Sequence, residues 1–378
     1  MLRRVTEDRS ASFVELFFDL VFVFGVTQVA ASIHGHLDWS TLWRAAIVLA
    51  LLWWAWTQYT WVAGSADFDE LRPRIVMLLA TAGSFVIAAS VQGAWGSDGR
   101  TFAMSYFAVM ALAAVFLLVL NWGTDRLSGA LVYLSQMMAG SVLVLVGGFV
   151  AEDIRPWFWV GAVLINVISS IVVERFEFDL AASHFAERHG LFVIIVLGEA
   201  LIAIGVNTVG APGSGAFLVA GTAILLTVLA MWWSYFDWVF RTGERVLKAA
   251  VGIARGRIAR DAYSLSHYPL VAGVILFAVG TEELLLHPGA ALEDPIRWAF
   301  LGGLILYVGS QSVMVLRLTG SVTWERLAFI GGLSLIGLLA SDINAAALGA
   351  LIAVGLVVTL GIETVRHRRP LTQPRPDH

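Results

Sequence analysis

The sequence is built largely from apolar runs of about 20 residues, and this feature restricts the folds open to the chain. A helix rises ~1.5 Å per residue, so about 20 apolar residues cross the hydrocarbon core of a bilayer. The runs are too long for strands and lack their alternation of polar and apolar residues. We predict an all-α, polytopic membrane protein with about twelve transmembrane helices. The predicted spans are 13–34, 43–63, 74–94, 101–121, 129–150, 157–173, 189–209, 215–240, 265–286, 296–316, 325–341 and 343–365.

Composition agrees with a membrane protein and excludes several other classes. Hydrophobic residues make up 58% of the chain and charged residues 14%, whereas about a quarter of a soluble domain is charged. No segment offers the basic face that a nucleic-acid-binding protein needs. The chain has no cysteine, which excludes disulfides and thiolate chemistry. The first apolar run contains two acids and no small-residue cleavage site, unlike a signal peptide.

Lysine and arginine are distributed unevenly between the predicted loops. If the N-terminus is inside, 20 of the 24 lysine and arginine residues fall in inner segments. The four in outer loops are Arg44, Arg100, Arg155 and Arg297. Positive residues accumulate on the cytoplasmic side of membrane proteins. We therefore predict that both termini are cytoplasmic, which requires an even number of spans.

Two aromatic segments indicate an internal repeat. WWAWTQYTW (53–61) in the second span matches WWSYFDWVF (232–240) in the eighth, with Gln58 opposite Asp237. Six spans separate these segments, so the two halves would keep the same orientation, as in many secondary transporters. Aromatic residues also gather at membrane interfaces without any repeat. We favour a 6+6 parallel repeat as the prediction to be tested.

This repeat divides the chain into an N-terminal six-helix half (1–173), a central cytoplasmic connector (174–188) and a C-terminal six-helix half (189–378). The second half includes a basic segment, 241–262, and a tail, 366–378. The apolar spacing of the basic segment predicts an amphipathic helix on the inner leaflet, where anionic lipid favours cations. A solvated basic linker is the alternative.

Ionisable residues inside the predicted spans are the main candidates for function, because each costs about 2.5 kcal/mol or more at membrane depth. The candidates for transport or ion binding are Glu15, Asp19, Glu199, Asp237 and His267. Glu199 is ten residues into its span, hence about 15 Å deep. The others lie towards the cytoplasmic ends of their spans. The polar set therefore concentrates in the cytoplasmic half, with one deep acid.

Glu15 and Asp19 are four residues apart and share one helix face. If both face a cavity, repulsion and burial favour binding of a proton or a hard cation. Alternatively, they pair with arginines such as Arg72, Arg74 or Arg188 and fasten helices together. Both interpretations stay open at the level of sequence.

A second polar segment, SHFAERHG (183–190), lies just before the seventh predicted span. His184 and Glu187 are three residues apart and offer half of a metal site. With no second such motif, a pH-sensitive or capping cluster at the surface is the commoner outcome. We predict no metal site, cofactor or catalytic residue. The secondary candidates are Gln58, Asp67, Asp69, His184, Glu187, Arg188 and His189.

Several motifs resemble one known family. They are VELFFDLVFVFGVTQVA (14–30), YTWVAGSADFDELRPRIVMLL (59–79), HFAERHGLFVIIVLGEALIAIG (184–205), MWWSYFD (231–237) and RDAYSLSHYPLVAGVILFAVG (260–280). In this order they resemble the bacterial low temperature requirement A family over nearly the whole chain. The resemblance implies a multi-pass protein of the bacterial inner membrane that is associated with growth in the cold, and it supplies no substrate.

The family motifs place their acids on a subset of the residues chosen above. Carried over by the resemblance, they are Glu15, Asp19, Glu187 and Glu199, with Asp67, Asp69, Asp237 and His267 in the weaker motifs. Most of these positions also lie at membrane depth in the predicted spans, independently of the resemblance.

Three functions fit the sequence. The leading prediction is a proton- or cation-coupled transporter, or permease, in which Glu199 and Asp19 carry the ion. A cation channel lined by the acid-bearing first helix is the first alternative. A membrane-embedded enzyme acting on a lipid or lipid-linked substrate is the second. The expected partners are the bilayer and a small solute, proton or cation, with no nucleic acid. The oligomeric state stays open, a homo-oligomer included.

Overall fold

The computed structural model describes residues 10–64, 66–125, 127–172, 180–208 and 213–368, and these ranges are mostly helical. Among them, β-type pairing is limited to an isolated bridge between Ala291 and Asn344. The prediction of an all-α fold is confirmed for the described residues. The helices of the first part are α1 (Phe13–Ile33), α2 (Trp39–Ala63), α3 (Leu71–Ala89), α4 (Gly99–Asn121), α5 (Leu127–Phe149) and α6 (Arg155–Val172).

The second part contains longer and shorter helices. The long ones are α7 (Ala182–Thr208), α8 (Gly215–Ser234), α11 (His267–Leu286), α12 (Asp294–Thr319), α13 (Trp324–Leu339) and α14 (Ala345–Arg368). Between α8 and α11 lie α9 (Phe240–Ala249), α10 (Gly252–Ile258) and two π-helical segments, η2 (Tyr235–Val239) and η3 (Ala259–Leu265). π-Helical turns are rare and frequently occur at functional positions.

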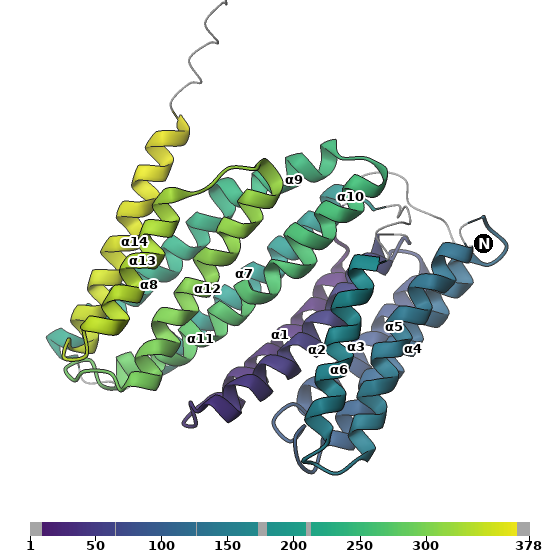
Figure 1. Cartoon of the computed structure of the whole chain (residues 1–378), viewed down its shortest axis with the longest axis horizontal. Coiled ribbons are helices and arrows are strands. Elements are labelled where there is room, and N and C mark those ends of the chain that lie inside the picture. Colours follow the sequence, from purple (N-terminus) through teal and green to yellow (C-terminus); the bar gives the residue numbers. More distant parts are fainter. Residues whose placement is uncertain (1–9, 65, 126, 173–179, 209–212, 369–378) are drawn as a thin grey trace, which may run out of the picture.

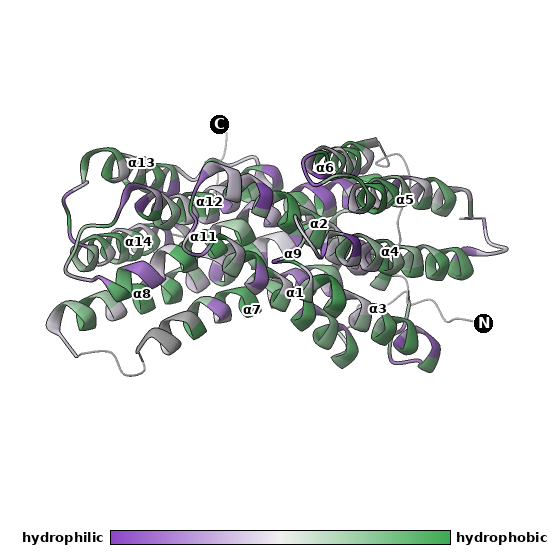
Figure 2. Cartoon of the chain, turned by 90° about the horizontal axis from the view of Figure 1, so that it is seen from below, coloured by the Kyte–Doolittle hydropathy of each residue, from purple (hydrophilic) through white to green (hydrophobic). Residues whose placement is uncertain are grey.

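In the described ranges, nine helices are long and apolar enough to cross a membrane. Figure 2 shows that the long helices are hydrophobic over most of their length. The chain is therefore a multi-pass helical membrane protein. Each of the twelve predicted spans coincides with a helix, but α6, α7 and α13 are not among these nine. The count of twelve crossings remains a prediction.

The helices form two groups side by side, α1–α6 and α7–α14 (Figure 1). In the first group α1 packs on α3, α3 on α4, α4 on α5 and α5 on α6, while α2 contacts α1 and α6. In the second group α7 packs on α11, α11 on α12, α12 on α13 and α13 on α14, while α8 contacts α7 and α14. Contacts of α1 and α2 with α7 and α11 join the groups. The helix α1 begins, and α14 ends, at the end of the bundle that holds α9 and α10, which we call the α9 end (Figure 1).

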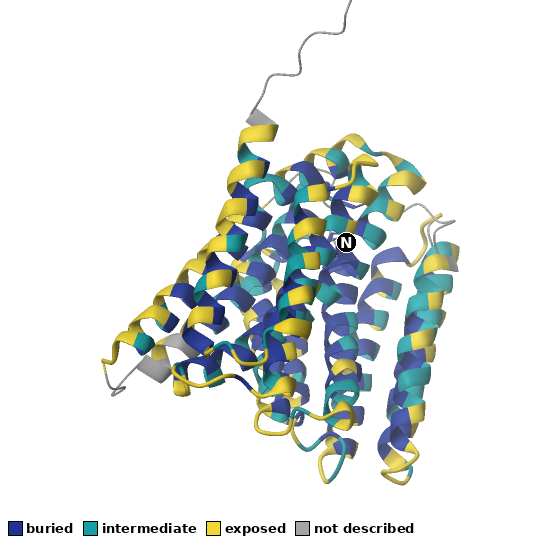
Figure 3. Cartoon of the chain, turned by 60° about the vertical axis from the view of Figure 1, so that its left-hand side comes forward, coloured by how far each residue is buried: buried dark blue, intermediate teal, exposed yellow. Residues whose placement is uncertain are grey.

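Burial follows this arrangement. Figure 3 shows buried residues on the inner faces of the helices and exposed residues on the outer faces and in the loops. The helices α11 and α12 approach most closely at two glycines: a Cβ on Gly303 would lie 2.4 Å from the Phe277 amide nitrogen, and one on Gly273 would lie 2.5 Å from the Gly303 carbonyl oxygen. Small residues allow this close packing where lipid gives helices no hydrophobic drive to associate.

The helix that contains the seventh predicted span begins seven residues before that span. The connector was predicted to extend to residue 188, but α7 begins at Ala182. The first turns of α7 are buried because Phe185 and Ala186 pack with Leu247 of α9 and Tyr263 of η3. The basic segment 241–262 contains the helices α9 and α10 and the start of η3, and α9 packs on α7. Its position on the inner leaflet remains a prediction. Residues 173–179 of the predicted connector, and most of the predicted tail, lie outside the described residues.

Candidate functional site

The two carboxylates of α1 face the start of α7, at the contact between the two helix groups. Glu15 and Asp19 lie one helical turn apart, and both are fully buried. Ser12, just before α1, donates its amide and hydroxyl to Glu15 Oε2 at 2.8 and 2.7 Å. This local contact satisfies one of the free amides at the start of the helix and fixes the Glu15 side chain.

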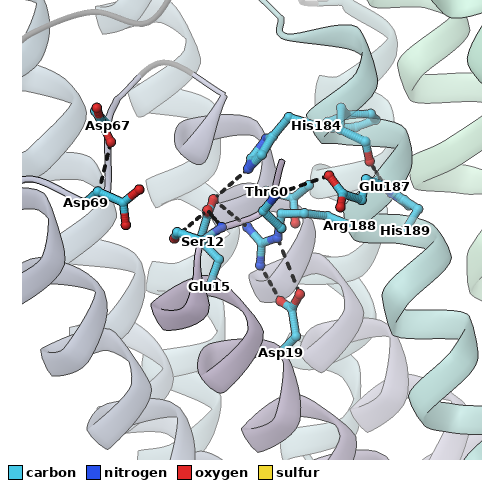
Figure 4. Close-up of polar contacts among 12 residues, drawn as sticks. Ser12, Glu15, Asp19, Thr60, Asp67, Asp69, His184, Glu187, Arg188 and His189 are labelled. Atoms are coloured by element: carbon cyan, nitrogen blue, oxygen red, sulfur yellow. Dashed lines mark hydrogen bonds and ion pairs between the residues drawn. The ribbon is translucent and has the colours of Figure 1, made fainter. Parts of the chain in front are cut away.

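Each carboxylate meets a different basic residue of α7 (Figure 4). The Asp19 carboxylate accepts hydrogen bonds from the Arg188 guanidinium and, at 2.7 Å, from Trp56 Nε1 of α2. The Glu15 Oε1 lies 2.8 Å from His184 Nε2. The pairing of acids with arginine, one of the two interpretations of the sequence, is therefore correct for Asp19, and the arginine is Arg188. We call Glu15, Asp19, His184 and Arg188 the α1–α7 network.

Two buried polar atoms of the α1–α7 network form no hydrogen bond with the described residues. Arg188 Nη1 has no hydrogen-bond partner among the residues that the structure describes, and it lies 3.9 Å from Glu15 Oε1. The Nδ1 of His184 also lacks a partner among the described residues. Burying such atoms without partners costs free energy, so they mark a place where another group or another arrangement can be accommodated.

Two further histidines lie beside the network. His189 is buried, with its Nδ1 donating to the Phe185 carbonyl at 2.9 Å and its ring 4.9 Å from that of Trp56. The ring centroid of His267 lies 5.0 Å from that of His189. The Nδ1 of His267 lies 3.0 Å from the Tyr263 carbonyl oxygen, and its Nε2 lies 2.7 Å from the Tyr235 hydroxyl. Because a carbonyl only accepts, Nδ1 of each histidine carries a proton.

The histidines of the SHFAERHG segment were expected more often at the surface, and this expectation was wrong. His184 and His189 are fully buried because α7 starts earlier than predicted and its first turns pack on α1 and η3. Glu187 Oε2 accepts the Ala11 amide at 3.1 Å, so it also faces the start of α1. In the described part of the chain, no group of three or more histidines and acids has the arrangement of a metal site.

The remaining predicted acids do not join the network. Asp67 and Asp69 bond each other in the loop before α3, through the Asp69 amide (Figure 4). Asp237, on η2, is partly exposed and lies 3.9 Å from Arg241. Glu199 is partly buried, eleven residues after Arg188 on α7, hence about 16 Å further along the helix. Gln58 is buried and accepts a hydrogen bond from Tyr133 of α5.

Sequence reasoning missed a second buried ion pair. Arg326 of α13 donates to Glu363 of α14 at 3.0 Å, to Gln311 Oε1 at 2.6 Å and to the Ser234 carbonyl at 2.9 Å. We call these residues the α13–α14 cluster. In the sequence, Arg326 is one of the 20 cations assigned to the inner side and has no other signal of a buried role. The available signal was Glu363, an acid inside the last apolar run.

The comparisons with known proteins agree with the sequence motifs. The profile of the family described as bacterial low temperature requirement A protein matches residues 10–361. An uncharacterized protein of Rhizobium meliloti (strain 1021) is 30% identical over 322 residues, which cover 82% of this chain and 78% of the relative. No solved structure matches the chain.

Proposed function

Because this chain belongs to the bacterial low temperature requirement A family and buries an acid–histidine contact between two helix groups, we propose that it is a proton- or cation-coupled transporter. In this proposal it crosses the bacterial inner membrane twelve times, with both termini and the α9 end in the cytoplasm. The placement of 20 of 24 lysine and arginine residues supports this orientation. The family description supports a role in growth at low temperature.

The packing order of the helices supports a parallel repeat. In each group the first helix packs on the third, the chain of contacts continues to the sixth, and the second helix contacts the first and the sixth. In this scheme α11 is the third and α14 the sixth helix of the second half. Two such halves that rock against each other expose a central site alternately to the two sides of the membrane.

The contact between Glu15 and His184 carries the proposal. It joins the first helix of one half to the first helix of the other, and both side chains are fully buried. Imidazole is the side chain that ordinarily changes charge near neutral pH, and a carboxylate beside it provides a second position for the proton. The charged and titratable groups around this contact are Asp19 on α1 and Glu187, Arg188 and His189 on α7.

The coupling step follows from these contacts. To open the α9 end, α1 must separate from α7, which breaks the attraction of Glu15 for His184 and of Asp19 for Arg188. A proton on the Glu15 carboxyl removes its charge and weakens its attraction to both basic residues. Release of that proton restores the attraction and closes the α9 end. Glu199, further along α7, is a second candidate carrier on the same helix.

Flux measurements on reconstituted protein test this proposal. Liposomes that enclose a pH-sensitive dye are exposed in turn to Na⁺, K⁺, a neutral polyol and a zwitterionic amino acid. We expect one of these to change the internal pH with wild-type protein but not with Glu15→Gln. Glu363→Gln is the matched control, because it makes the same chemical change in the α13–α14 cluster. The assay on Glu199→Gln decides whether Glu199 carries protons as well.

A response to none of these solutes, or an undiminished response in Glu15→Gln, would contradict proton coupling. A cation channel is the second candidate, favoured by the meeting of the two first helices, α1 and α7, between the halves. It predicts single-channel currents far above transporter rates, and these are measured in planar bilayers. The enzyme hypothesis stays a prediction, tested by incubating the protein with lipid extracts and analysing the products.

A further inference from the structure

A pocket lies where the two helix groups meet, next to the α1–α7 network but separate from it. Its walls come from α2, α5 and α6 of the first group and from α10 and η3 of the second. The volume of the pocket that the centre of a water-sized sphere can occupy is about 70 Å³. A single water needs about 10–15 Å³ by this measure, so the pocket has room for a solute of roughly five to seven non-hydrogen atoms.

The lining combines aromatic rings with neutral polar groups. Trp54, Trp61 and Tyr133 contribute the rings, while Gln58, Gln136 and Ser170 contribute amide and hydroxyl groups. Three polar atoms of the lining have no hydrogen-bond partner in the described residues: the donor Trp54 Nε1 and the acceptors Gln136 Oε1 and Asn166 Oδ1. A ligand must therefore both accept and donate, and a hydroxyl group does both with one oxygen atom.

The charge in the pocket is already balanced. Arg260 is the cation of the lining, and its Nε donates to Asp261 Oδ1 at 2.7 Å. Its Nη1 donates to the Ser170 carbonyl at 3.4 Å. The described lining contains no carboxylate that would attract a cation. An uncharged ligand fits this balance better than an anion or a cation, because burying an unpaired charge is costly.

From these observations we infer that the pocket binds a small, neutral, polyhydroxylated solute, and that this is the class of molecule the protein transports. The part on transport rests on the proposed function, whereas the binding does not. Aromatic faces hold the carbon skeleton, and amide and hydroxyl groups bond the solute hydroxyls, as in polar ligand sites generally.

The pocket is connected to the α1–α7 network through α2 and η3. Ser264 of η3 lines the pocket. Its carbonyl oxygen accepts a hydrogen bond from Trp53 Nε1 at 2.6 Å, and its hydroxyl oxygen accepts one from Trp61 Nε1 at 3.1 Å. One turn from Trp53 on the same helix, Trp56 donates to Asp19. A solute that displaces Ser264 or Trp61 therefore acts on the helix that holds the acid. This link is how a bound solute would influence the closure of α1 on α7.

Binding to the purified full-length protein tests the inference without any measurement of protons. Saturation-transfer NMR in glycerol-free detergent measures the Kd for glycerol. We expect saturable binding that Gln136→Leu weakens about tenfold, because a lost hydrogen bond of ~1.4 kcal/mol changes Kd by that factor. Trp54→Phe, which removes the donor and keeps a ring, should weaken binding similarly. Gln92→Leu is the matched control, because Gln92 bonds Gln28 outside the pocket.

Competition defines the ligand class. Lactate, which is as large as glycerol but anionic, and 1,2-dimethoxyethane, which is as large but has no O–H donor, should not displace glycerol. Absence of saturable glycerol binding, equal binding by wild type, Gln136→Leu and Trp54→Phe, or displacement by lactate would overturn the inference. Proton flux with another solute would then leave the proposed function standing. Specific glycerol binding without any proton flux would leave the binding inference standing and contradict the proposed function.

Discussion

The α1–α7 network and the α13–α14 cluster are similarly buried, but they differ in how fully their polar atoms are used. Every guanidinium nitrogen of Arg326 has a partner, whereas Nη1 of Arg188 has no hydrogen bond to any described residue. The Arg326 partners all lie in the second helix group, whereas Arg188 joins that group to the first. A saturated ion pair within one group suits a permanent contact, and an unsaturated one between groups suits a contact that opens. Burial alone does not separate these roles.

The largest effect is expected from breaking the saturated pair. Arg326→Met leaves the buried Glu363 carboxylate without its arginine, and we expect the free energy of unfolding to fall by about 3–5 kcal/mol. Thermal unfolding in detergent measures this. Adding Glu363→Leu to the same chain should recover most of the loss, because the buried charge is then gone. If Arg326→Met unfolded like the wild type, the α13–α14 cluster would not be a structural latch.

A smaller loss of stability is expected at the network, with a larger effect on transport. Asp19→Asn keeps an acceptor for Trp56 but loses the charge beside Arg188. A hydrogen bond to a charged group contributes about 1.5–3 kcal/mol, part of which Glu15 can replace from 3.9 Å. We expect flux to fall at least about tenfold, while Glu363→Gln at equal folded amount retains it. Equal flux in these two variants would remove the distinction between the two ion pairs.

The smallest effect is expected at an exposed acid, which extends the comparison to the surface. Asp38 caps α2, and the hydrogen bond from the Thr41 amide at 2.8 Å holds the pKa of its carboxyl below the usual value. A lowered pKa in the folded state stabilises the fold above pH ~4, and the gain is lost as pH falls through the folded pKa. Asp38→Asn should therefore unfold slightly earlier than wild type at pH 7.

The same difference should disappear once the pH lies well below the lowered pKa of the folded Asp38 carboxyl, where both side chains are neutral. Unfolding midpoints of the two proteins at the two pH values check this. A gap that persisted or grew in acid would mean that the capping bond does not depend on the charge of Asp38.

Helix positions could be predicted because they depend on local properties of the chain. Apolar length, the absence of alternation and the short polar breaks placed helices at all twelve predicted spans. The start of α7 was not predicted because HFAERHG is polar enough to resemble a loop, and it becomes buried only through its contacts with α1, α9 and η3. The pocket was missed, although Asn166, Ser169 and Ser170 on α6 follow the i, i+3, i+4 spacing of one helix face.

The sequence by itself determined the class of the protein, its family and two of its buried acids, Glu15 and Asp19, because hydrophobicity and motifs are properties of single segments. Only the tertiary structure decided which basic residue meets which acid. Asp19 and Arg188 are 169 positions apart, and local periodicity does not encode a pairing over that distance. The same holds for the pocket, whose walls come from both helix groups and exist only after the groups have packed.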